Sequence, residues 1–208
     1  MTSLTRLFSD STHLTKLQPL LVTELFLPTG KLLACDPVAY SDPQPFRQPF
    51  LPGCYPVYIH LLPADQCIAY AELRLREGTV SRWELAVTAR QDPASLAPGE
   101  IFGYPVSAGL GCFMDHSTLA LVNRHDADLQ AELGDAYVSY YDDYVDDLLY
   151  PAAGSQPYCT LQPYPSQENN VAVFQSGYGD GFYATYFGLN AHDQPVKFVT
   201  EFIDANAN

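Results

Sequence analysis

The feature that most constrains this chain is a change of hydrophobic period in its middle. Over residues 20–88 and again over 171–202, apolar and polar residues alternate in short runs, which is typical of half-buried β-strands. Between these flanks, one apolar stripe recurs at the three- and four-residue intervals of an α-helix. Its members are Leu129, Leu133, Tyr137, Tyr140, Tyr144 and Leu148. We therefore predict a mainly β (α+β) protein with one helical insertion at about residues 116–149.

The strand-like runs are short because 17 prolines and 13 glycines divide the chain. We expect strands near 20–26, 31–35, 55–62, 67–76, 81–88, 171–175, 182–188 and 196–202. They are predicted to form one antiparallel system, a sandwich or strongly bent sheet, in which 20–26 and 31–35 make a hairpin. Residues 151–170 are predicted to be a loop. We interpret residues 1–208 as a single domain, with residues 1–18 as an N-terminal strap.

The glycine-rich stretch from Gly103 to Asp115 separates the first β-patterned region from the predicted helix. Glycine permits a positive φ and a close approach between backbones, so we predict a tight turn that directs Cys112 and Asp115. Asp115 is also a candidate N-cap for a helix beginning at His116. Leu110, Phe113 and Met114 surround Cys112 with apolar neighbours, which predicts a buried thiol.

The charge balance excludes some partners. The chain has 24 acidic and 10 basic residues, a net charge of −14, so it would repel nucleic acid. No segment approaches the roughly 20 apolar residues of a membrane helix, so no membrane partner is predicted. The five cysteines are odd in number and form no Cys-x-x-Cys pair, which favours a reduced, cytoplasmic protein.

The acidic residues are concentrated in one interval. No Lys or Arg occurs between Arg124 and Lys197, whereas the predicted helix is rich in Asp and Tyr. Like charges on one helix repel each other, so this clustering favours a surface that binds a basic protein partner. The predicted contact residues are Asp135, Asp142, Asp143, Asp146, Tyr137 and Tyr141. An ordinary solvated acidic surface is the alternative.

A catalytic site is the alternative interpretation of the residues near 112. A thiol close to a helix N-terminus, with Asp115 and His116 beside it, matches a nucleophile system of Cys, His and Asp. For metals, the candidates are Asp36, Asp115, Asp180 and the five histidines, His13, His60, His116, His125 and His192. No pair of them has a recognised ligand spacing, so neither metal nor cofactor is predicted. Residues 177–181 lack the Lys-Ser/Thr of a phosphate loop and are predicted to be a hairpin turn.

Several motifs together resemble a bacterial family catalogued as domain of unknown function 4241. They are Leu27-Pro-Thr-Gly-Lys31, Cys35-Asp-Pro37, Pro52-Gly-Cys-Tyr-Pro-Val57, Arg82-Trp-Glu-Leu85, Gly109-Leu-Gly-Cys-Phe-Met-Asp115, Ser176-Gly-Tyr-Gly-Asp-Gly181 and Val199-Thr-Glu-Phe202. The resemblance supplies no catalytic residues, but some similar families serve as immunity proteins against secreted toxins. The leading expectation is a non-enzymatic cytosolic binding protein, most concretely an immunity protein that neutralises a basic bacterial toxin. The alternatives are a hydrolase or transferase with a site around Cys112, Asp115 and His116, and a scaffold with no charged partner.

Overall fold

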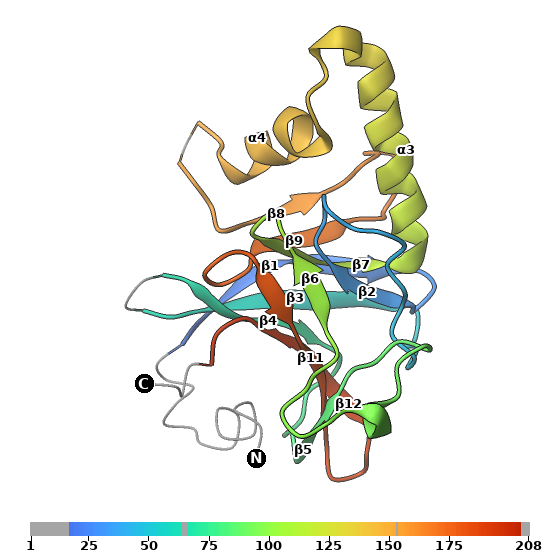
Figure 1. The fold of residues 1–208 in the computed structure, drawn as a ribbon, viewed down its shortest axis with the longest axis vertical. Helices are drawn as coiled ribbons and strands as arrows, with labels where there is room; N and C mark the ends of the chain where they lie inside the picture. Colours follow the sequence, from blue (N-terminus) through green and yellow to red (C-terminus); the bar gives the residue numbers. More distant parts are fainter. Residues whose placement is uncertain (1–16, 64–65, 153, 205–208) are drawn as a thin grey trace.

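The protein is built in three layers in a computed structural model, which describes residues 17–63, 66–152 and 154–204. Two antiparallel sheets, of six and four strands, pack face to face, and a helical segment covers the outer face of the smaller sheet (Figure 1). The predicted fold class, mainly β with antiparallel sheets and a helical insertion, is confirmed.

The strands do not follow chain order within the sheets. The larger sheet has the order β1 (Gln18–Leu27), β3 (Gly53–Leu61), β4 (Ile68–Arg74), β12 (Pro195–Glu201), β11 (Thr185–Leu189), β5 (Arg82–Leu85). The smaller sheet has the order β2 (Leu32–Cys35), β7 (Leu110–Asp115), β9 (Val171–Gln175), β8 (Tyr158–Leu161). A third pair joins β10 (Gly181–Tyr183) to β6 (Tyr104–Val106), and a short 3-10 turn, η1 (Pro93–Ser95), lies in the β5–β6 connection.

The core between the two sheets is dominated by phenylalanine. Phe113 on β7 meets Phe198 on β12 with ring centroids 5.4 Å apart, so one edge-to-face contact joins the two sheets. Phe174 and Phe187 extend the same cluster within each sheet. Such aromatic contacts each add about 0.5–1.5 kcal/mol beyond the burial of their area.

The strand β7 explains why residues 110–115 carry no alternating pattern. Phe113 packs into the core between the sheets, whereas Cys112 and Met114 pack toward the helices, so all six residues are buried. A strand that is buried on both faces has no polar face and therefore no period of two. The prediction of a tight turn over 103–115 is wrong for most of this stretch, because residues 104–106 form β6 and residues 110–115 form β7.

The helical layer, residues 116–149, contains two helices, because Gly134, a poor helix former, interrupts the predicted helix. α3 (His116–Leu133) ends at Gly134, whose φ of +55° is left-handed, and a turn, η2 (Gly134–Ala136), follows. The second helix joins a π-helical turn, η3 (Tyr141–Val145), to α4 (Asp146–Leu149). The predicted single stripe is thus interrupted: Leu133 is 37% exposed. Leu129, Tyr140, Tyr144 and Leu148 pack against the smaller sheet.

The predicted hairpin of 20–26 with 31–35 is wrong. β1 pairs with β3, whereas β2 pairs with β7 in the other sheet. The turn between them lets the chain cross from one sheet to the other, and Gly30 is essential there. Its φ is +67°, and a Cβ would lie 2.0 Å from the carbonyl oxygen of Phe50. Local periodicity identifies strands but not the strands they pair with. The strands that were predicted to form one antiparallel system therefore lie in two separate sheets. The predicted loop at 151–170 also contains a strand, β8.

Two further predictions concern the N-terminus and membrane-spanning helices. Residues 1–16, which form most of the predicted N-terminal strap at 1–18, lie outside the described residues. Among the residues that are described, no helix is long and apolar enough to cross a membrane.

Candidate functional site

Asp115, a member of the predicted catalytic alternative, is fully buried and holds two segments of backbone together. Its Oδ1 accepts hydrogen bonds from the Ser117 amide at 2.8 Å and the Ser117 hydroxyl at 2.7 Å, so it caps α3 as predicted. Its Oδ2 accepts from the Thr29 amide at 3.0 Å, and the Thr29 hydroxyl also donates to the carboxylate. The carboxylate therefore ties the β1–β2 turn to the start of α3.

Asp36 and Asp180, the other acidic metal candidates, also bind backbone amides. Asp36 is buried, and its two carboxylate oxygens accept from the amides of Val38 and Ala39 and from those of Ser107 and Ala108. Asp180 accepts from the amide of Gly109 at 3.1 Å. These carboxylates position turns, and within the described residues no group of three or more His, Cys, Asp or Glu side chains could hold a metal ion.

Cys112 is buried as predicted, with no exposed surface, and burial raises the pKa of its thiol well above the usual value. Its sulfur lies 3.6 Å from the sulfur of Cys35, its partner in register on β2. His116 is exposed at the start of α3. The alternative catalytic site therefore has a thiol without solvent access and a carboxylate that is already engaged by Thr29 and Ser117.

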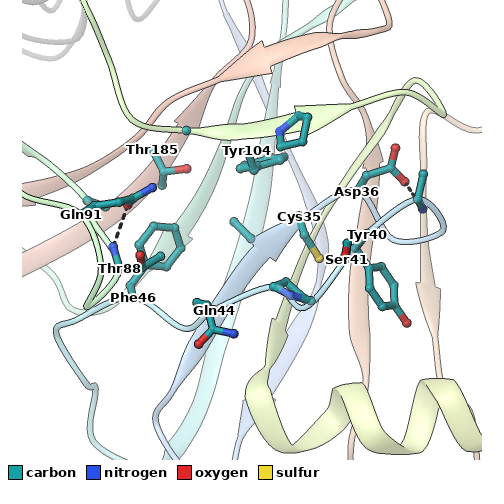
Figure 2. A pocket seen from close by; sticks show the side chains of 16 residues that line it. Cys35, Asp36, Tyr40, Ser41, Gln44, Phe46, Thr88, Gln91, Tyr104 and Thr185 are labelled. Atoms are coloured by element: carbon teal, nitrogen blue, oxygen red, sulfur yellow. Dashed lines mark hydrogen bonds between the residues drawn. The ribbon is translucent and has the colours of Figure 1, made fainter. Parts of the chain in front are cut away.

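A cavity of about 300 Å³ lies beside these cysteines, where the smaller sheet, the larger sheet and β6 meet. Cys35 and Asp36 of the β2 end contribute one wall, Thr88 and Thr185 the opposite wall, and Tyr104 lies between the two walls (Figure 2). The segment that follows β2 closes the remaining side through Tyr40, Ser41, Pro43, Gln44 and Phe46. The cavity is not predictable from the sequence, because its walls come from segments that are far apart in the chain.

Polar groups in the cavity wall are mostly engaged with the protein. The Gln91 side-chain oxygen accepts from the Thr88 amide at 2.8 Å (Figure 2). The Tyr40 hydroxyl donates to Asn123 at 2.6 Å. Burial raises the pKa values of Tyr40 and Tyr104, so both phenols remain protonated at neutral pH. The wall is therefore uncharged apart from Asp36, and its one soft nucleophile is Cys35.

A buried charge cluster on β4 was also missed by sequence analysis. Glu72 has no exposed surface, and its carboxylate contacts His60 at 2.7 Å, Lys197 at 2.9 Å and Arg74 at 3.0 Å. Burial alone would raise the pKa of Glu72, but His60 and Lys197 outweigh it and hold the pKa below its usual range. The signal in the sequence was an acid within the apolar run Ile68–Leu73.

A family model described as "Protein of unknown function (DUF4241)" matches residues 25–200. The chain belongs to this family. No curated protein and no solved structure matches the chain. Of the motifs that carried the resemblance, those containing Asp36, Asp115 and Asp180 are accounted for by turns that these carboxylates hold.

In this DUF4241 protein, the residues predicted to bind a partner are distributed along the helical layer. Asp135 is exposed directly after α3, and Asp142, also exposed, accepts from the Ser139 hydroxyl in the first turn of the second helix. Asp143 accepts from the amides of Val138 and Ser139, which gives it a structural role. Asp146 is half-buried.

The two predicted tyrosines are tied to acidic neighbours. Tyr137 donates to Asp126, and this hydrogen bond raises the pKa of Tyr137 to about 12. Burial and Asp146 raise the pKa of Tyr141 to about 12. Both hydroxyls therefore stay protonated and serve mainly to satisfy carboxylates within the layer.

The turn between the two helices is the most exposed part of the layer. Val138 is 70% exposed and Leu133 is 37% exposed, although both are large apolar side chains. Glu132 and Asp135, both exposed, flank Leu133 in the chain. We call residues 132–138 the acidic tip. Figure 1 shows this turn at the end of the molecule farthest from β5 and β12. The protein therefore presents apolar groups and negative charge together.

Proposed function

We propose that this DUF4241 protein is a non-enzymatic binding protein whose helical layer captures a basic protein. In its most concrete form it is an immunity protein that neutralises a basic bacterial toxin, with carboxylates occupying sites that phosphates would use. The observation that carries the proposal is the acidic tip, where Leu133 and Val138 are exposed beside Glu132 and Asp135.

An apolar centre with a charged rim is the usual anatomy of a protein interface. Val138 and Leu133 would be such a centre. The rim has one sign, because no Lys or Arg occurs between Arg124 and Lys197. A field of one sign raises the association rate with an oppositely charged partner.

The alternative, a hydrolase or transferase around Cys112, receives less support from the geometry. A nucleophilic thiol needs access to substrate and a lowered pKa. Cys112 is fully buried and its pKa is raised by that burial. Asp115 already accepts hydrogen bonds from two residues, so no oriented Cys–His–Asp system is assembled at this position.

The test measures association and dissociation rates with the product of the neighbouring gene, which the proposal expects to be basic, at 50 mM and 300 mM salt. The variant carries Glu132→Gln, Asp135→Asn, Asp146→Asn and Asp147→Asn; Asp143 is retained because it binds backbone amides. We expect association to slow by about tenfold at low salt and to depend less on salt. A second variant, Val138→Ser, should dissociate faster without a change in salt dependence.

The matched control neutralises four exposed acids outside the helical layer and changes the net charge by the same amount. It carries Glu24→Gln, Asp42→Asn, Glu77→Gln and Glu84→Gln. If the control slows association as much as the layer variant does, the net charge rather than the helical layer attracts the partner. Unchanged rates in both the layer variant and Val138→Ser would refute the proposal.

A further inference from the structure

The strongest unassigned chemical feature is a pair of thiols, Cys35 and Cys112, at the edge of the smaller sheet. They lie directly opposite each other in the β2–β7 ladder, and their sulfur atoms are 3.6 Å apart. Both side chains are buried, and neither forms a disulfide in this structure. The two cysteines are separate from the acidic tip, so the inference goes beyond the proposed function.

The backbone already has the geometry that a disulfide needs. Opposite residues of an antiparallel ladder have Cα atoms about 4.5–5.5 Å apart, within the range of about 4.4–6.8 Å found across disulfides. Rotation of the two side chains can therefore bring the sulfurs to bonding distance without a change of register. β2 also adjusts more easily than an inner strand, because it is the edge strand of its sheet.

One of the two thiols has a route to solvent. Cys35 lines the 300 Å³ cavity together with Tyr40 and Tyr104, and its sulfur is visible between the cavity walls in Figure 2. Cys112 does not line the cavity and has no exposed surface. A small oxidant that enters the cavity therefore meets Cys35 first and reaches Cys112 only through it.

We propose that Cys35 and Cys112 are a reversible oxidation site, with Cys35 reacting first with hydrogen peroxide in the cavity and Cys112 closing the disulfide. In the first step the Cys35 sulfur attacks one peroxide oxygen, the O–O bond breaks, and Cys35 sulfenic acid and one water form. In the second step the Cys112 sulfur attacks the Cys35 sulfur, the S–O bond breaks, and a second water leaves with the remaining thiol proton. Two thiols are oxidised and one peroxide is reduced to two waters.

Cys159, which lies in the same row of side chains across the smaller sheet as Cys112, is an internal control. Cys112 lies opposite Val173 on β9, and Val173 lies opposite Cys159 on β8, so Cys159 is two strands from Cys112. At about 4.8 Å per strand, Cys159 is too distant to form a disulfide with Cys112. Cys159 is also buried, and burial raises its pKa to about 12. Cys159 and Cys112 are therefore similar in burial, and they differ in that only Cys112 lies next to Cys35.

The experiment uses the full chain with Cys54→Ser and Cys67→Ser, which removes two other cysteines that could cross-link. The folded protein is treated with hydrogen peroxide, remaining thiols are blocked in denaturant, and peptides are identified by mass spectrometry. We expect a Cys35–Cys112 linked peptide as the main product, lost on treatment with dithiothreitol and unchanged in Cys159→Ser. In Cys112→Ser, Cys35 should instead accumulate sulfinic acid, since no second thiol is near.

Three results would overturn the inference. One is a peroxide-treated protein in which both Cys35 and Cys112 are still blocked as thiols. Another is a linked peptide that contains Cys159, and the third is a Cys35–Cys112 link that forms only after denaturation. The measurement on the chain with native Cys35 and Cys112 decides the matter even if Cys112→Ser does not fold.

Discussion

The carboxylates of the sheets and those of the helical layer differ in what their oxygens contact. Asp36, Asp115 and Glu72 are buried, and their oxygens accept hydrogen bonds from backbone amides or contact cations. Asp135 and Asp147 in the helical layer are exposed. A net charge of −14 therefore combines two populations: acids that hold the chain together and acids that remain at the surface.

Negative charge indicates a binding surface only where the carboxylates are not already bound within the protein. A motif that contains aspartate suggests a catalytic or metal site, but Asp36 and Asp115 show that a buried carboxylate often satisfies backbone amides that have no other partner. Even within the helical layer, Asp143 belongs to the structural population because it binds two amides. The acids of the layer that bind no backbone amide can be changed at a smaller structural cost, and they are the ones that a binding experiment should test.

The largest effect is expected from Glu72→Gln, which removes the charge that Lys197 and Arg74 contact in a buried position. Breaking a buried ion pair from one side costs about 3–5 kcal/mol. Because the Arg74 and Lys197 side chains are partly exposed, at 29% and 18%, we expect about 3 kcal/mol in urea unfolding. The control is Glu84→Gln, an exposed partner of Arg82, with an expected loss below about 1 kcal/mol.

The same variant has a defined pH dependence. The pKa of Glu72 is lower in the folded than in the unfolded state. Its contribution to the free energy of unfolding is therefore complete above the unfolded pKa of about 4.3 and is lost as the pH falls toward the pKa of the folded state. The stability difference between wild type and Glu72→Gln should therefore shrink below pH 4. A difference that stays constant from pH 7 to pH 3 would show that Glu72 acts through packing alone.

The fold was predictable from the sequence where an element has one buried face. The β-patterned flanks and the helical region were correctly identified because periods of two and 3.6 reflect one-sided burial. β7 was missed because Phe113 and Cys112 are both buried, on opposite faces, so no period remains. The pairing of β1 with β3 depends on the route taken after Gly30, which involves contact with Phe50 from a distant turn.

The candidate site was less predictable from the sequence, because the contacts that build it join residues far apart in the chain. Asp115 was correctly predicted to cap α3, which is a local interaction, but its hydrogen bonds to Thr29 span 86 positions. Cys35 and Cys112 are separated by 77 positions, and nothing in the sequence near either residue indicates that they are neighbours. The cavity likewise requires four separate segments of the chain to meet, those around Cys35, Thr88, Tyr104 and Thr185.

An intermediate effect is expected at Asp115, where the helical layer begins. Asp115→Asn keeps one oxygen, which is enough to cap α3, because Asn is as good an N-cap as Asp. Its amide nitrogen cannot accept from the Thr29 amide, so a donor is left without its partner, at a cost of about 1–3 kcal/mol. Asp115→Ala should lose about 1 kcal/mol more, because the cap is also removed. Equal stabilities of Asp115→Asn and wild type would mean that the Thr29 contact contributes nothing.

The smallest effect, and one of opposite sign, is expected in the helical layer. Asp147 is exposed and lies four residues after Asp143, so their like charges repel, and Asp147→Asn should stabilise the protein by about 0.2–0.5 kcal/mol. The gain should disappear in 1 M NaCl, where the Debye length is about 3 Å, whereas the loss in Glu72→Gln should persist because that cluster is buried. Urea unfolding at two salt concentrations measures both. If Asp147→Asn were destabilising at low salt, Asp147 would belong with the structural carboxylates of the sheets, and the surface left for a basic partner would be correspondingly smaller.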